Sequence, residues 1–136
     1  MKALSLSLLF MLLSCQTKSQ DSVIGEYSSP ERSTLNSLRH GAYAMDLNLQ
    51  LQENGEYVYS TCAQIAKGTW TVRNNELILK CREKRMTIDS LNQVDKYAKG
   101  KICGDDEVFE IKGNKLYREE MMNKKKYKFI LFKNNI

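Results

Sequence analysis

The sequence predicts an all-β protein whose eight or nine antiparallel strands run up and down around a barrel. From Val23 onward, apolar and polar residues alternate with a period of two, which is typical of half-buried strands. Short turn signals, Asn54-Gly55, Asn74-Asn75 and Gly113-Asn114, separate these runs at the close spacing of antiparallel hairpins. Residues 23–136 are enough for one domain around one core, so we expect a single barrel domain.

The first residues predict an exported protein with a lipid anchor. Lys2 precedes an apolar stretch, residues 3–13, which is about half the length that a bilayer-spanning helix needs. Ser14 then supplies the small residue that a secretory signal carries before its cleavage site. A cysteine at the next position resembles the lipobox of bacterial lipoproteins. The resemblance implies that residues 1–14 are a lipoprotein signal peptide and that Cys15 is acylated.

After cleavage, residues 15–22 read as the lipidated cysteine and a short, flexible polar tether. An acylated Cys15 would attach the protein to a membrane of the cell envelope, and we expect the outer membrane. The mature chain would keep 20 basic and 16 acidic side chains, a net charge of +4. The densest basic patch, Lys124 to Lys126 with Lys128, lacks the features of a nucleic-acid site. We interpret it as a solvated strand edge, with anionic lipid head groups or acidic glycans as the alternative partners.

The segment before the first clear hairpin contains weaker signals. Residues 23–27 predict a first strand, bent at Gly25. Residues 30–38 are the one stretch that predicts a short helix. Ser28, Ser29 and Ser33 are the alternatives for its N-cap.

Pairing outward from each turn predicts the register of the hairpins. A two-residue type I′ turn at Asn54-Gly55 predicts the pairs Leu51 with Val58, Leu49 with Ser60, and Leu47 with Cys62. This register places Tyr57 and Tyr59 on the polar outer face. The turn at Asn74-Asn75 predicts the pairs Trp70 with Leu79, Val72 with Leu77, and Gly68 with Cys81. The turn at Gly113-Asn114 pairs Ile111 with Leu116 and aligns Phe109 with them.

The remaining segments leave alternatives open. Residues 85–91 predict a further strand, whereas residues 92–106 are either a strand with a long loop or mostly loop. The last strand, residues 127–133, buries either Tyr127, Phe129 and Leu131 or Ile130 and Phe132. The predicted core contains Leu47, Leu49, Leu51, Val58, Trp70, Val72, Leu77, Leu79, Phe109, Ile111 and Leu116.

Three motifs between residues 23 and 118 carry a resemblance to a known family. They are Gly55-Glu56-Tyr57, Gly68-Thr69-Trp70 and Leu77-Ile78-Leu79. In this arrangement they resemble the small lipocalin-like, calycin-type β-barrels of Gram-negative lipoproteins. The resemblance implies a lipocalin-like barrel. It indicates little about function, because barrels of this kind support many activities.

A barrel of about eight strands can enclose one small ligand, and the sole tryptophan is the natural residue to contact it. Trp70 would face inward beside a gap left by Gly68, with Leu79 as its cross-strand neighbour. These three residues are the predicted ligand-binding set. The alternative is that Trp70 simply packs one end of a solid core.

The cysteines other than Cys15 are odd in number. Cys62, Cys81 and Cys103 allow at most one intramolecular disulfide. The predicted register separates Cys62 from Cys81 by about two strand spacings, roughly 9–10 Å, which is too far for a disulfide. Cys103 could reach either one. Three reduced thiols are the alternative.

No motif indicates catalysis, a metal or a cofactor. His40 is the only histidine and has no patterned partner for a nucleophilic triad. Asp105, Asp106 and Glu107 lack the staggered spacing of a calcium loop. Met121 and Met122 would point to opposite faces of a strand. We therefore do not expect an enzyme.

Two functions remain. One is a non-catalytic, membrane-anchored lipoprotein whose barrel binds a small apolar ligand. The other is a protein-interaction module of the envelope, such as an enzyme inhibitor or a stress-response accessory, with a filled barrel. An interior cavity above about 300 Å³ would favour the first.

Overall fold

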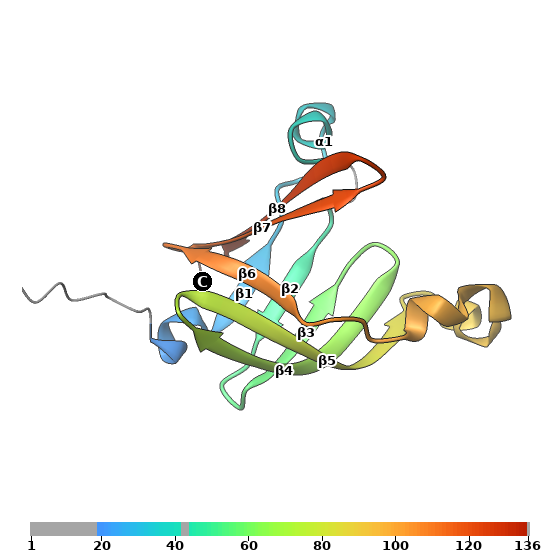
Figure 1. The fold of residues 1–136 in the computed structure, drawn as a ribbon, viewed down its shortest axis with the longest axis horizontal. Helices are drawn as coiled ribbons and strands as arrows, with labels where there is room; N and C mark the ends of the chain where they lie inside the picture. The colour runs from blue at the N-terminus through green and yellow to red at the C-terminus, as the bar shows by residue number, and fades with distance from the viewer. Residues whose placement is uncertain (1–18, 42–43, 136) are drawn as a thin grey trace, which may run out of the picture.

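A computed structural model describes residues 19–41 and 44–135 of the chain. Within these ranges, eight antiparallel strands pair in chain order, and the last pairs with the first to close a barrel. Figure 1 shows this barrel with α1 and the β7–β8 hairpin at one side and a helical segment projecting beyond β5. The predicted up-and-down, all-β barrel is confirmed. The signal peptide, residues 1–14, and Cys15 lie outside the described residues.

The strands are β1 (Gly25–Ser28), β2 (Asn48–Leu51), β3 (Glu56–Ser60), β4 (Gln64–Arg73), β5 (Glu76–Met86), β6 (Glu107–Lys112), β7 (Lys115–Met122) and β8 (Lys125–Lys133). Among the described residues, the helical segments are η1 (Gln20–Val23), α1 (Thr34–His40), η3 (Asp89–Gln93) and η4 (Asp95–Lys101), of which only α1 is α-helical. Across the described part of the chain, no helix has the length and apolar character needed to span a bilayer.

Side chains from all the strands fill the barrel interior. In the described part of the chain, Trp70, Tyr27 and Phe109 are the largest side chains that are almost completely buried. Most of the predicted core residues are buried with them: Leu47, Leu49, Leu51, Leu77, Leu79, Ile111 and Leu116. Val58 and Val72 are only half-buried. Burial of these apolar side chains is the main source of stability for a barrel of this size.

The register of the β2–β3 hairpin differs from the prediction by one residue. Leu51 lies opposite Tyr57, and Leu49 lies opposite Tyr59. The predicted pairs of Leu51 with Val58, Leu49 with Ser60, and Leu47 with Cys62 are therefore wrong. Tyr57 and Tyr59 are buried, and Val58 lies on the outer side of the sheet.

The loop of this hairpin explains the difference. The N–H of Gln52 donates to the carbonyl oxygen of Glu56 over 2.9 Å, so the loop contains three residues, 53–55. Of these, only Gly55 has a positive φ, 80°. A type I′ turn would need two such residues, whereas a three-residue loop needs one, at its last position. The extra loop residue turns every side chain of β3 to the opposite face.

The other two hairpins confirm their predicted registers. Asn74 and Asn75 have φ values of 51° and 61°, as a type I′ turn requires. The pairs across this turn are Trp70 with Leu79, Val72 with Leu77, and Gly68 with Cys81. Across the turn at Gly113, Ile111 pairs with Leu116.

The segments that the sequence left open take definite forms. β8 buries Phe129 and Leu131, and Tyr127 packs against the same core. α1 begins after Ser33, whose Oγ accepts a hydrogen bond from the N–H of Asn36 over 3.1 Å. Residues 20–23, which include the end of the predicted flexible tether, form the helical turn η1 and bury Val23.

The predicted strand at residues 85–91 is wrong beyond Met86, where β5 ends. The side chain of Asn92 accepts a hydrogen bond from the N–H of Met86 over 2.8 Å and donates to its carbonyl oxygen over 3.2 Å. The Asn92 amide thus bonds the backbone groups of Met86 that a neighbouring strand would otherwise bond, and the chain continues as η3 and η4. Residues 92–106 are therefore 3-10 helix and loop.

Candidate functional site

Trp70 is part of the packed interior. Its indole N–H donates to the carbonyl oxygen of Gln52 over 3.0 Å, and its backbone N–H donates to the carbonyl oxygen of Gly55 over 2.9 Å. These bonds join β4 to the loop between β2 and β3. Leu79, its cross-strand partner, is buried as well. In this position Trp70 closes one end of the core, which agrees with the packing alternative.

The expected gap at Gly68 is filled. A Cβ atom at this position would overlap the carbonyl oxygen of Lys80 and would lie 3.0 Å from Cε1 of Tyr57. The glycine thus permits a close approach of β5 and of the Tyr57 ring, which the shifted β2–β3 register turns inward. The prediction of an open space beside Trp70 is wrong for this reason.

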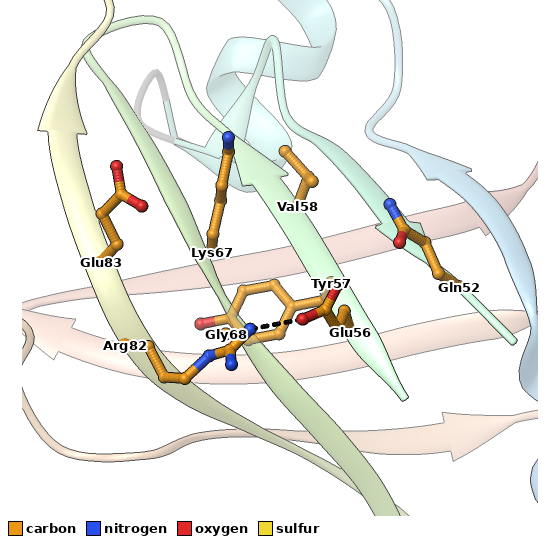
Figure 2. Close-up of a pocket in the computed structure, with 8 residues that line it drawn as sticks. All are labelled: Gln52, Glu56, Tyr57, Val58, Lys67, Gly68, Arg82 and Glu83. Carbon is orange, nitrogen blue, oxygen red and sulfur yellow. Dashed lines mark hydrogen bonds and ion pairs between the residues drawn. The ribbon is translucent and has the colours of Figure 1, made fainter. Parts of the chain in front are cut away.

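A groove of about 490 Å³ lies on the outer side of β3, β4 and β5, at the level of Gly68. Figure 2 shows the ring of Tyr57 behind Gly68, with charged side chains from β4 and β5 around it. The residues that line this β3–β5 groove are Gln52, Glu56, Tyr57, Val58, Lys67, Gly68, Arg82 and Glu83.

A β-bulge in β5 shapes this groove. Lys67 pairs with Glu83 and Gly68 pairs with Cys81, so Arg82 is an extra residue without a partner in β4. The bulge lets the Arg82 side chain reach β3, where its guanidinium lies 2.6 Å from a carboxylate oxygen of Glu56 (Figure 2).

The charges in the β3–β5 groove suit binding better than proton transfer. The hydrogen bonds that Arg82 and Asn54 donate to Glu56 lower the pKa of its carboxyl group. Burial raises the pKa of Tyr57 to about 12, and the nearby charges of Glu107 and Asp106 act in the same direction. At neutral pH, Glu56 is therefore ionised and Tyr57 is neutral.

A disulfide joins Cys81 and Cys103, whose Cα atoms lie 5.6 Å apart. It ties the chain that follows η4 to the side of β5. Cys62, in the turn between β3 and β4, is an exposed free thiol. The structure thus selects one of the pairings that the sequence left open.

A second groove, of about 450 Å³, lies between the end of α1 and the start of β8. Leu38, Arg39 and Gly41 line one side of it, and Lys125, Lys126 and Tyr127 line the other. The sequence analysis missed this site, because it treated the lysines as a solvated edge. The sequence feature that could have revealed it is the three-residue spacing of Leu35 and Leu38, which places both on one side of the predicted helix.

The acidic residues near β6 form ion pairs. Arg118 lies 2.9 Å from a carboxylate oxygen of Glu107 and 3.1 Å from one of Glu120. Its guanidinium also stacks between two aromatic rings, 5.1 Å from that of Phe109 and 4.7 Å from that of Phe129. Within the ranges that the structure describes, no three His, Cys, Asp or Glu side chains are placed to hold a metal ion together.

Comparisons with known proteins gave no match: no protein-family model, curated protein or solved structure is significantly similar to this chain.

Proposed function

We propose that the protein is a membrane-anchored, non-catalytic interaction module of the cell envelope with a filled, lipocalin-like barrel. The observation that carries this proposal is the packed interior. The residues expected to contact a small ligand are instead a hydrogen-bonded Trp70, a buried Leu79, and a Gly68 in close contact with the next strand.

The position of the grooves supports an interaction surface. The two grooves described above are open to solvent on the outside of the barrel, and neither is lined by Trp70 or Leu79. An interior ligand would need a cavity of roughly 300 Å³ or more among these side chains. A partner protein needs only the outer surface and the loops.

The location rests on two features of the chain. The lipobox-like sequence that ends at Cys15 supports export and a lipid anchor at the outer membrane. The Cys81–Cys103 disulfide fits an oxidising compartment such as the periplasm, because reducing cytoplasm seldom preserves such bonds.

The intact mass of the natively purified protein tests this proposal. We expect a chain that begins at an acylated Cys15, contains one disulfide, and retains no small molecule. In the same cells, a photo-crosslinking residue at exposed positions such as Leu38, Ile88 or Ile102 should give discrete protein adducts. A stoichiometric small molecule whose removal changes the fluorescence of Trp70 would contradict the filled barrel and restore the ligand-binding function.

A further inference from the structure

Helix α1 exposes its apolar side chains. It has seven residues, and none of them is buried. The exposed fraction is 57% for Leu35 and 80% for Leu38, which lie three positions apart and so share one side of the helix. So short a helix gains little stability by itself, and helices of folded proteins ordinarily bury their apolar stripe. The two leucines of α1 therefore form an uncovered apolar stripe.

The tip of the β7–β8 hairpin lies beside α1 and adds positive charge. Lys124, Lys125 and Lys126 lie at its turn and are all exposed. We call Leu35, Leu38, Arg39, Lys125 and Lys126 the α1–hairpin face. Figure 1 shows α1 next to this hairpin.

The groove within the α1–hairpin face is built by a specific contact. Gly41 ends α1 with a φ of 88°, and a Cβ atom there would overlap Cδ1 of Tyr127. A glycine thus lets the Tyr127 ring lie directly against the end of the helix. The result is a groove with an apolar wall from Leu38 and Tyr127 and a cationic rim from Arg39, Lys125 and Lys126.

The charge of this rim restricts the occupant. One of its cations, Lys126, lies 2.7 Å from a carboxylate oxygen of Glu119, and both side chains are exposed to water. Among the described residues, the charged side chains that line the groove are all cations, so the same face of a second copy would be repelled. The complementary occupant carries carboxylates together with large apolar side chains.

The position of the face restricts the occupant further. In Figure 1, η1, where the described chain begins, lies on the opposite side of the barrel from α1. Residues 15–18 add at most about 14 Å of extended chain before it. A barrel anchored through Cys15 would therefore turn the α1–hairpin face away from its own membrane. This orientation favours a protein segment over the lipids of the anchoring leaflet.

We infer that the α1–hairpin face binds an acidic segment of a partner protein that also carries large apolar side chains. Its apolar side chains cover Leu35 and Leu38, and its carboxylates pair with Arg39, Lys125 and Lys126. Burial of the leucines supplies affinity, and charge pairs at the rim speed association and select the partner. The inference rests on the proposed function and specifies its partner.

Binding of two labelled peptides to the full processed chain, held in uncharged detergent micelles, tests the inference. The acidic peptide has about 14 residues, with leucines at helical spacing and glutamates elsewhere, and the basic peptide carries lysines in place of the glutamates. We expect the acidic peptide to bind, with an affinity that falls as the salt rises from about 50 to about 500 mM. We expect no binding of the basic peptide.

Two double variants locate the site, and each has a matched control. Lys125→Glu with Lys126→Glu should weaken binding about tenfold or more, whereas Lys112→Glu with Lys115→Glu, on the β6–β7 hairpin, should change it less than about twofold. Leu35→Ser with Leu38→Ser should weaken it by a similar factor, whereas Ile88→Ser with Ile102→Ser should not. All eight of these side chains are exposed, and unfolding curves would verify that each variant folds.

Three outcomes would overturn the inference. The first is equal binding of both peptides, or of neither, by the native chain. The second is binding to phosphatidylglycerol vesicles, but not to the acidic peptide, that depends on the same residues. The third is self-association that the Lys125 and Lys126 variants abolish. In each case the proposed function is judged separately, by whether crosslinkers elsewhere on the barrel still capture discrete protein partners.

Discussion

Cys81 and Cys103 are joined by a disulfide just beyond the point where β6 stops pairing with β5. The pairing of β5 with β6 ends at Leu79 and Glu107, and the rest of β5 extends beyond it. The disulfide holds the chain after η4 against this part of β5, with a Cα–Cα distance of 5.6 Å. It thereby closes a covalent loop around η3 and η4, with a sequence separation of 22 between the two cysteines.

Loss of this disulfide should lower the stability of the barrel. A cross-link across a loop of this length restricts the unfolded chain and is worth about 3 kcal/mol. We expect Cys103→Ala to lower the free energy of unfolding by about this amount and to make it insensitive to reductant. Denaturant unfolding with and without reductant measures the effect. Cys62→Ala is the matched control and should behave like the native chain, so equal losses for the two variants would argue against the assignment of the disulfide.

Two substitutions on neighbouring strands of one hairpin test the position of the core. Leu79 is buried opposite Trp70, whereas Thr71 faces water. We expect Leu79→Ala to cost about 2–5 kcal/mol. Thr71→Ala should cost less than about 0.5 kcal/mol. Similar midpoints of chemical denaturation for the two variants would contradict this core.

A matched pair of substitutions tests the shifted β2–β3 register. Tyr59 is buried, and its ring meets that of Phe109 edge to face with centroids 6.2 Å apart. Val58, its neighbour, lies on the outer side. Tyr59→Ala should cost about 3–5 kcal/mol, and Val58→Ala only about 1 kcal/mol. The reverse order would restore the two-residue turn that the sequence favoured.

Stability should fall in alkaline solution. Burial raises the pKa of Tyr27 from 10.0 to about 12, and it raises that of Tyr57 equally. Between these pH values the unfolded chain releases the phenolic protons and the folded chain retains them, so the stabilising effect is complete below pH 10 and is lost as the pH approaches 12. Unfolding curves measured across this range should show the fall, and Tyr57→Phe should make it shallower. A stability that stays constant up to pH 12 would mean that these rings are accessible to water.

The anchor is tested by Cys15→Ser. If Cys15 is acylated, this variant should accumulate as an unprocessed or mis-sorted chain, whereas Cys62→Ser should be processed normally. Fractionation of cells and the mass of the mature amino terminus measure the outcome. A native chain that is cleaved elsewhere and carries no acyl group would refute the lipoprotein assignment.

Local chemistry was enough to determine several elements from the sequence. Two adjacent asparagines accept the two positive φ values of a type I′ turn, so the register of the β4–β5 hairpin followed directly, including Trp70 opposite Leu79. A short helix in this region followed from its serine cap candidates, of which the structure selects Ser33, and it lies at Thr34–His40 instead of residues 30–38. In both cases the determining interactions lie within a few residues of one another.

Tertiary structure alone decided the features that depend on distant segments. Asn54-Gly55 is compatible with a two-residue or a three-residue loop, and tyrosine fits either face of a strand. The choice followed from the burial of Tyr57 against Gly68 and of Tyr59 against Phe109. Cys103 found Cys81 because η3 and η4 return the chain to β5.

The two grooves were decided in the same way. The bulge at Arg82 brings a β5 side chain to Glu56 on β3, and the contact of Gly41 with Tyr127 joins α1 to β8. Period-two alternation reports which residues share a face within one strand, but it carries no information about which distant side chain meets them there. The sequence by itself therefore determined the barrel and most of its core, whereas the packing of distant segments determined where its surface grooves lie.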